Sequence, residues 1–148
     1  MVSRIYGRGR GARAKRGICR NTDLLHLQHA GAVMATPVPL SRLQGKELVP
    51  QAIVDRPLGY FAERFRLDIV RGHDDFDNFE AAAIEVADGH LIIELKHYAG
   101  YPENTTTIYL PFEIRGLPQV TLWIDLIIRE LKIPRGWVSW QRANDPDL

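Results

Sequence analysis

The sequence predicts an α+β fold: an antiparallel sheet of four to five strands, connected as a meander, with one principal buried C-terminal helix packed on one face. Three features predict this class. Apolar runs flank an Asp-Gly pair at positions 88–89, β-branched and aromatic residues fill positions 105–111, and positions 118–134 are apolar with helical spacing. Because a chain of 148 residues can bury roughly two thirds of its unfolded surface, we expect one domain.

The chain divides by charge into a basic N-terminal extension, residues 1–33, and a single α+β domain, residues 34–148. The extension carries seven Lys/Arg and one acid, a net charge of +6, whereas the domain carries twelve Lys/Arg and seventeen acids, a net charge of −5. Glycines and dense like charge predict a largely disordered extension. Three interpretations stay open: it binds nucleic-acid phosphates, it is an organellar transit segment, or Met34 is the natural start and the extension is not part of the working protein.

The first part of the domain, residues 37–59, contains four prolines and two glycines, which predict an extended or turn-rich lead-in. Within it, residues 48–55 (LVPQAIVD) fit either a short strand or one helical turn. Residues 64–72 alternate between apolar and charged side chains, and this period of two predicts a strand. Its apolar face consists of Phe65, Leu67 and Ile69.

A hairpin follows, because Ala87–Gly89 (ADG) separates the apolar runs 79–86 and 90–98, and glycine accepts a positive φ at little cost. Residues 105–111 form the next strand, which ends at Pro111 because proline removes a donor from the ladder. The alternation assigns five apolar side chains to the core face: Leu91, Ile93, Leu95, Ile108 and Leu110. His97 shares that parity, so we expect a packed or hydrogen-bonded histidine.

Residues 118–134 are the clearest helix: Pro118 suits a first turn, and Pro134 and Gly136 halt it. Its polar residues form one narrow stripe (Thr121, Asp125, Arg129 and Lys132), in which we expect Asp125 to pair with Arg129. The remaining circumference is apolar, which predicts burial against the sheet, where the alanines at 81–83 permit close approach. Residues 136–142 read as a closing strand and residues 143–148 as a loose acidic tail.

A tyrosine-rich hairpin, residues 96–111 (KHYAGYPENTTTIYLP), is the first candidate binding surface. The parity opposite the core face predicts an exposed outer face, with Tyr101 at its tip. Exposed tyrosine gives a rigid contact area with a polar end, which is why it concentrates at protein interfaces. The other predicted binding residues on this face are Glu94, Lys96, Tyr98 and Tyr109.

An acidic loop, residues 73–80 (HDDFDNFE), is the second candidate surface. Its binding residues are Asp74, Asp75 and Asp77. The spacing does not fit a calcium loop, because the glycine precedes the acids. A solvated loop is the simplest interpretation, and a negative patch that docks on a basic partner is the functional one.

The sequence carries no catalytic or cofactor signature, so we predict no catalytic residue, no metal site and no cofactor. Cys19 is the only cysteine and lies in the extension, the serines lack a nucleophile-elbow context, and no P-loop is present. The glycines of the extension have no preceding strand, so the dinucleotide fingerprint fails. One enzymatic alternative remains: a pocket between the sheet and the lead-in in which His97 or His73 acts with a carboxylate as acid and base.

The sequence therefore favours a small non-enzymatic binding or accessory protein that engages a protein partner, or a second copy of itself, through one of the two surfaces. The alternatives are the small enzyme and nucleic-acid binding, the latter only through residues 1–33. No apolar run is long enough to span a membrane, and one cysteine allows no intrachain disulfide. We accordingly expect no membrane association and a cytoplasmic location.

Overall fold

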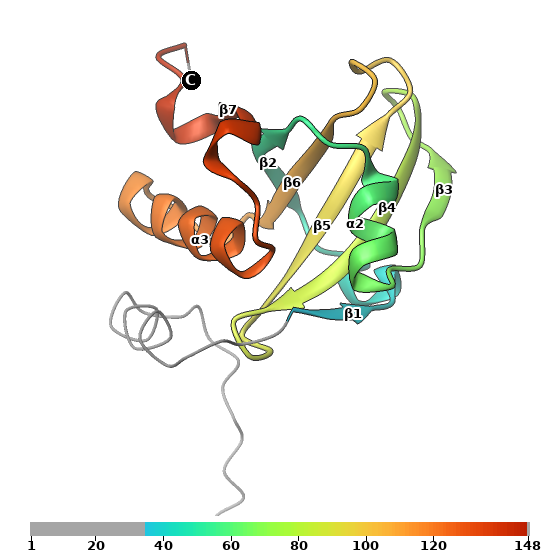
Figure 1. Cartoon of the computed structure of the whole chain (residues 1–148), viewed down its shortest axis with the longest axis horizontal. Helices are drawn as coiled ribbons and strands as arrows, with labels where there is room; N and C mark the ends of the chain where they lie inside the picture. The colour runs from blue at the N-terminus through green and yellow to red at the C-terminus, as the bar shows by residue number, and fades with distance from the viewer. Residues whose placement is uncertain (1–34, 148) are drawn as a thin grey trace, which may run out of the picture.

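Seven antiparallel strands form one sheet in the described part of the chain, residues 35–147 of this computed structural model (Figure 1). The sheet order is β1-β4-β5-β6-β2-β7, with β3 also paired to β4. The strands are β1 (Thr36–Val38), β2 (Leu48–Val54), β3 (Val70–His73), β4 (Asn78–Val86), β5 (Leu91–Tyr98), β6 (Thr106–Pro111) and β7 (Val138–Gln141). The α+β class is confirmed, although the sheet is larger than the four to five strands predicted. The basic extension, on which the three interpretations and the nucleic-acid alternative rest, lies outside the described residues.

The predicted meander runs from β3 through β6, and the lead-in adds strands at both sides of it. β1 and β3 share one edge, because β3 pairs with the first half of β4 and β1 with the second. The ambiguous segment 48–55 forms β2, which lies between β6 and β7 inside the sheet. Because these pairings join segments far apart in sequence, local patterns could not reveal them.

The predicted hairpin connects β4 to β5 through a turn at residues 87–90. Ala87, Asp88 and Gly89 have φ of 54°, 53° and 82°, so the Asp-Gly pair adopts the left-handed region as expected. The N–H of Ala87 donates to both carboxylate oxygens of Glu130, at 3.1 and 3.0 Å. This contact ties the turn to the end of the long helix α3 (Leu117–Glu130).

The predicted strand at residues 64–72 is wrong in its first half, where the chain forms helix α2 (Leu58–Phe65). α2 starts after Pro57 and ends at Arg66, whose φ of 56° is left-handed. β3 begins only at Val70, and Ile69 is exposed rather than in the core. The alternating residues therefore belong to three different structures: the last turn of α2, the left-handed residue Arg66, and the segment that leads into β3.

Both helices pack on the same face of the sheet, where they enclose one hydrophobic core. α2 lies across β4 and β5, whereas α3 packs near β2 (Figure 1). The predicted core face is confirmed, because the inward residues of β5 and β6 are buried with the apolar side of α3. The buried α3 residues are Val120, Trp123, Ile124, Leu126, Ile127 and Ile128. Asp125 pairs with Arg135 at 2.9 Å, not with Arg129 as expected, because η2 (Arg135–Trp137) folds back toward the helix.

The opposite face of the sheet is covered in part by the 3₁₀ turn η1 (Leu40–Leu43), which contacts β4 and β5. Leu43 is buried there, outside the main core. Of the three alanines of β4, only Ala82 belongs to the core beneath the helices; Ala81 and Ala83 alternate with it and face the η1 side. The expected close approach at the alanines is therefore divided between the two faces.

The C-terminal segment closes the sheet with β7, as predicted, and continues into the 3₁₀ turn η3 (Arg142–Asn144) rather than a wholly loose tail. Within residues 35–147, none of the helices has the length and apolar character needed to cross a bilayer.

Candidate functional site: a loop–hairpin surface

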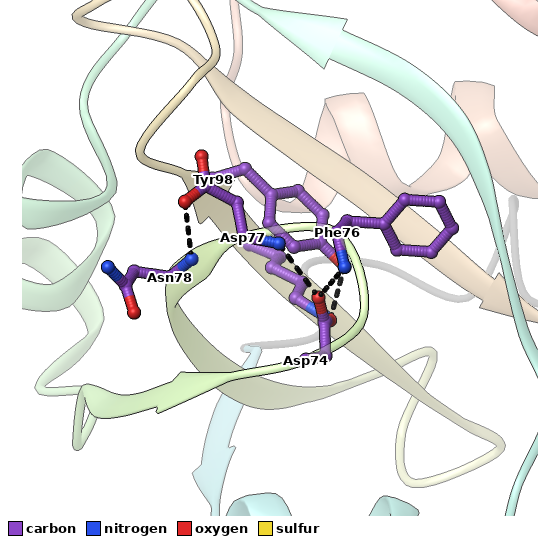
Figure 2. A network of polar contacts seen from close by, with 6 residues as sticks. Asp74, Phe76, Asp77, Asn78 and Tyr98 are labelled. Carbon is purple, nitrogen blue, oxygen red and sulfur yellow. Dashed lines mark hydrogen bonds and ion pairs between the residues drawn. The ribbon is translucent and has the colours of Figure 1, made fainter.

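The acidic loop and the tyrosine-rich hairpin, which the sequence offered as two alternative surfaces, meet at Asp74. The Tyr98 hydroxyl donates to Asp74 Oδ2 at 2.7 Å (Figure 2). Lys96 Nζ lies 3.2 Å from the same oxygen. Asp74 comes from the β3–β4 loop, whereas the other two come from β5. We call the combined region the loop–hairpin surface, which comprises Asp74, Asp75, Phe76, Asp77, Lys96, Tyr98 and Tyr101.

The loop itself is held by its own aspartates. Asp74 Oδ1 accepts from the backbone N–H groups of Phe76 and Asp77, at 3.0 and 3.3 Å (Figure 2). Asp77 Oδ1 in turn accepts from the N–H of Asn78 at 2.7 Å, and the N–H of Asp74 donates to the carbonyl of Asp77 at 3.2 Å. Such aspartate-to-backbone bonds replace the water that a loop would otherwise need, so they order this turn.

The electrostatics of the network keep both bonded partners in the required form. The Tyr98 hydroxyl, followed by the loop N–H groups and Lys96, lowers the pKa of Asp74 far below its ordinary value, although partial desolvation opposes the shift. Burial, reinforced by the bond to Asp74, raises the pKa of Tyr98 well above its ordinary value. The carboxylate therefore stays charged and the phenol stays a donor at any physiological pH.

Aromatic rings enclose the ammonium group of Lys96, so it is not exposed on the surface. Its ammonium lies 4.1 Å from the Phe79 ring centroid, 4.5 Å from that of Tyr98 and 5.8 Å from that of Tyr109. Its side chain is 11% exposed. Three aromatic rings and one carboxylate thus surround a cation of the protein itself, which is the arrangement that binds ammonium groups in aromatic cages.

The predicted exposure of the hairpin's outer face is wrong for most of its residues. Glu94 and Tyr98 are each 8% exposed and Tyr109 is half-buried, whereas Tyr101 is 43% exposed, as a tip residue should be. The parity was correct, but the 74–77 loop and η1 return over this face of the sheet. Of the acidic loop, Asp75 is exposed, while the bonded Asp74 and Asp77 are partly buried.

Phe76 is the residue of this surface that sequence reasoning missed. It is 87% exposed, and its ring points away from Asp74 (Figure 2). Its edge approaches Tyr98, with 6.2 Å between ring centroids, and Tyr98 in turn lies 5.5 Å from Tyr101. The available signal was a phenylalanine between Asp75 and Asp77, at a position outside any strand or helix period.

Glu94 is a buried acid for which no hydrogen bond is found among the described residues. Burial raises the pKa of Glu94 above its ordinary value, because desolvation outweighs the attraction of Lys96. The ionised side chain therefore destabilises the native state at neutral pH.

We expect Glu94→Gln to raise the melting temperature at pH 7. Since the folded pKa is raised, wild-type stability falls as pH rises through it, and the penalty is absent below the ordinary value of 4.5, where the carboxyl is neutral in both states. Thermal unfolding followed by circular dichroism from pH 4 to pH 8 should show the gain growing with pH. Glu103→Gln, at an exposed position of the same hairpin, is the control and should change nothing. A lower melting temperature for Glu94→Gln at pH 7 would mean that the attraction of Lys96 dominates.

A shallow depression of about 370 Å³ brings His97 and Glu80 together, as the enzymatic alternative requires, but at a different place. It is lined by strand residues of β3, β4 and the end of β5, and none of its described lining residues comes from the lead-in. Glu80 is engaged by Arg71 at 2.8 Å. His97 Nδ1 lies 2.9 Å from the carbonyl of Thr105, which can only accept, so Nδ1 carries a proton in this contact. The expected hydrogen-bonded histidine is confirmed.

His73, the other histidine of the enzymatic alternative, pairs with Asn78 Oδ1 at 3.1 Å and does not line that depression. Within residues 35–147 no group of three or more His, Cys, Asp or Glu residues could hold a metal ion. No protein family, curated protein or solved structure matches this chain.

Proposed function

We propose that the protein is a small non-enzymatic binding module that docks, through its loop–hairpin surface, on a protein partner that carries basic residues around an apolar pocket. The observation that supports this most is Phe76: a large apolar side chain, 87% exposed, on a loop whose backbone is ordered by Asp74. An exposed phenylalanine on a loop adds apolar surface that lowers solubility, whereas a partner that covers the ring would use it as an interface anchor.

The order of the loop favours tight docking. A flexible loop would lose conformational freedom on binding, and that loss would weaken affinity. Here the Asp74 bonds and the Tyr98 contact hold the loop before any partner arrives. Tyr101 extends the apolar contact area next to Tyr98, so the anchor is not isolated.

The charge around Phe76 specifies the partner. Asp75 and Asp77 flank it, and no Lys or Arg occurs between Arg71 and Lys96 in the sequence. Lys96 is enclosed by rings and cannot neutralise a partner's acids. Two copies of this surface would oppose aspartate with aspartate, so the complementary partner is a basic protein rather than a second copy.

We expect Phe76→Ala to abolish retention of that partner while leaving the melting temperature unchanged, because the side chain buries almost nothing in the free protein. The full chain and its variants would be immobilised and exposed to lysate of the native host, with bound proteins eluted by a salt gradient. A partner of the proposed kind should elute at low salt concentration, because salt screens the exposed charges in its contacts. Asp75→Lys should also prevent retention by reversing that charge.

Two substitutions at other exposed positions serve as matched controls: Val70→Ala for the lost apolar area and Asp88→Lys for the reversed charge. Both should retain what the wild type retains. A protein bound equally by Phe76→Ala and the wild type would place the interface elsewhere, and empty eluates from every bait would also contradict the proposal.

A further inference from the structure

A cavity of about 360 Å³ lies away from the loop–hairpin surface, between β2, the start of α3 and the turn η3. Its walls are mainly apolar and include Val49, Ile114, Leu117 and Val120. The volume falls within the roughly 300–1,000 Å³ that small-molecule sites occupy. Leu117, an exposed leucine at its rim, would be covered by a bound ligand.

A β-bulge directs Gln51 into this cavity. The β2–β6 register pairs Pro50 with Tyr109 and Ala52 with Ile108, which leaves Gln51 as the extra residue. Bulges of this kind re-aim one side chain and are common beside binding sites. In a regular strand Gln51 and Ala52 would point to opposite faces of the sheet. Here Ala52 belongs to the core beneath the helices, and Gln51 nevertheless lines the cavity together with Val49.

The Gln51 amide has no hydrogen-bond partner among residues 35–147. Gln51 as a whole is only 5% exposed. Among those residues, Trp123 Nε1 is the only polar side-chain atom that is both inaccessible to solvent and without a hydrogen bond. The unbonded amide atoms of Gln51 are therefore accessible, and because Gln51 lines the cavity, they open onto it. An unsatisfied amide in so enclosed a place is costly unless water or a ligand bonds to it.

Two arginines give the cavity its charge. Arg115 Nε donates to the carbonyl of Phe112 at 3.3 Å, and its guanidinium stacks 4.0 Å from the Phe112 ring centroid. This stacking holds the guanidinium in place while its terminal nitrogens keep free donors. Arg142 also lines the cavity. Neither arginine forms an ion pair within the described residues, although Arg142 lies near enough to Asp145 to help lower the pKa of that carboxyl. No acidic residue is among those that line the cavity.

The start of α3 adds to the positive potential. The residue before the helix, Gly116, has no side chain to cap the first turn, and that turn contains no acid. The partial positive charge at the start of this 14-residue helix is therefore not offset by an acid of its own first turn. The cavity therefore combines polar groups that suit an anion (the arginines, the amide and the helix end) with apolar side chains that suit an apolar body.

We infer that this cavity is a binding site for a small organic carboxylate with an apolar body. The arginines would receive the carboxylate, since a guanidinium matches its two oxygens, and the Gln51 amide would donate to it or to a neighbouring polar atom. The apolar part would lie against Val120 and Leu117. This inference does not depend on the proposed partner, because the two sites share no residue.

Benzoate, cinnamate and hexanoate, titrated into the ¹⁵N-labelled full chain, test the inference. We expect at least one of them to shift the Gln51 side-chain amide resonances and the backbone amides of residues 115–117. Benzamide, which has the shape of benzoate without its charge, should bind at least tenfold more weakly. Arg115→Gln and Arg142→Gln should each weaken carboxylate binding about tenfold, as expected for the loss of one charged hydrogen-bonding group.

Arg135→Gln is the matched control, because Arg135 pairs with Asp125 outside the cavity, and it should bind like the wild type. If either arginine variant fails to fold, Gln51→Leu replaces it, since filling an unpartnered amide site with an apolar side chain should preserve the fold and still reduce binding. Absence of shifts with all three carboxylates would overturn the inference. Equal binding of benzamide and benzoate, or undiminished binding by the folded cavity variants, would overturn it as well.

Discussion

Phe61→Ala is expected to lower the free energy of unfolding by about 3–5 kcal/mol, the range for truncating a buried aromatic residue. Phe61 is completely buried on the core side of α2, and its ring lies edge-on to that of Tyr60, with 5.2 Å between the ring centroids. Tyr60 continues this contact to Trp137 at 5.6 Å. The substitution thus leaves a cavity at the place where α2 and η2 join the core. Urea unfolding followed by fluorescence and circular dichroism would measure the loss.

Gly59→Ala supplies the control in the same helix. A Cβ at this exposed position meets no atom within 4 Å, and alanine favours a helix over glycine, so stability should rise by about 0.5–1 kcal/mol. A loss below about 1 kcal/mol for Phe61→Ala would mean that the site collapses readily or that α2 is not packed as described.

α2 is an element of this fold that could not be predicted from the sequence. α3 and the β4–β5 hairpin were predictable because each carries a long local pattern with clear ends: Pro118 at the start of the helix and Asp88-Gly89 in the turn. α2 has only eight residues, and its buried positions, Leu58 and Phe61, are too few to establish a helical period. Its last residue instead completed an apparent alternation with the strand that follows.

The loop–hairpin surface was predictable in its parts and not in its assembly. The sequence identified Asp74 and Tyr98 as candidates on two surfaces, but these residues are 24 positions apart, and only the folded sheet brings them to hydrogen-bond distance. Alternation along β5 separated its two faces correctly. It could not show that the 74–77 loop covers one of them, because that contact depends on the pairing of β3 with β4.

The same dependence on tertiary contact applies to the Gln51 cavity. A glutamine inside an otherwise apolar β2 segment reads as an ordinary polar position of a strand. Its significance comes from the register shift against β6 and from Arg115 and Arg142, which arrive from distant parts of the chain. Neither the bulge nor the approach of η3 leaves a local signal in the sequence.

Lys96→Met is expected to lower the free energy of unfolding by about 2–3 kcal/mol, although methionine has nearly the same length and keeps the contacts with the rings. The substitution removes the cation from the rings of Phe79 and Tyr98 and leaves Glu94 buried without an opposite charge nearby. Lys96 attracts the Glu94 carboxylate without a direct ion pair, and removing only one of two enclosed opposite charges is usually worse than removing both, because the remaining charge is left desolvated. Urea unfolding at pH 7 would measure the loss.

The double variant Lys96→Met/Glu94→Gln distinguishes a stranded charge from lost packing. If the stranded carboxylate causes a large part of the loss, the double variant should be more stable than Lys96→Met alone, and the two single effects should not add. Additive effects would assign the loss to the contacts of Lys96 with the aromatic rings and with Asp74.

Lys96→Met should also weaken retention of the proposed partner while Phe76 is intact, because Asp74 loses one of the contacts that join its loop to β5. Unchanged retention would show that the Tyr98 hydroxyl and the loop's own hydrogen bonds suffice to present Phe76.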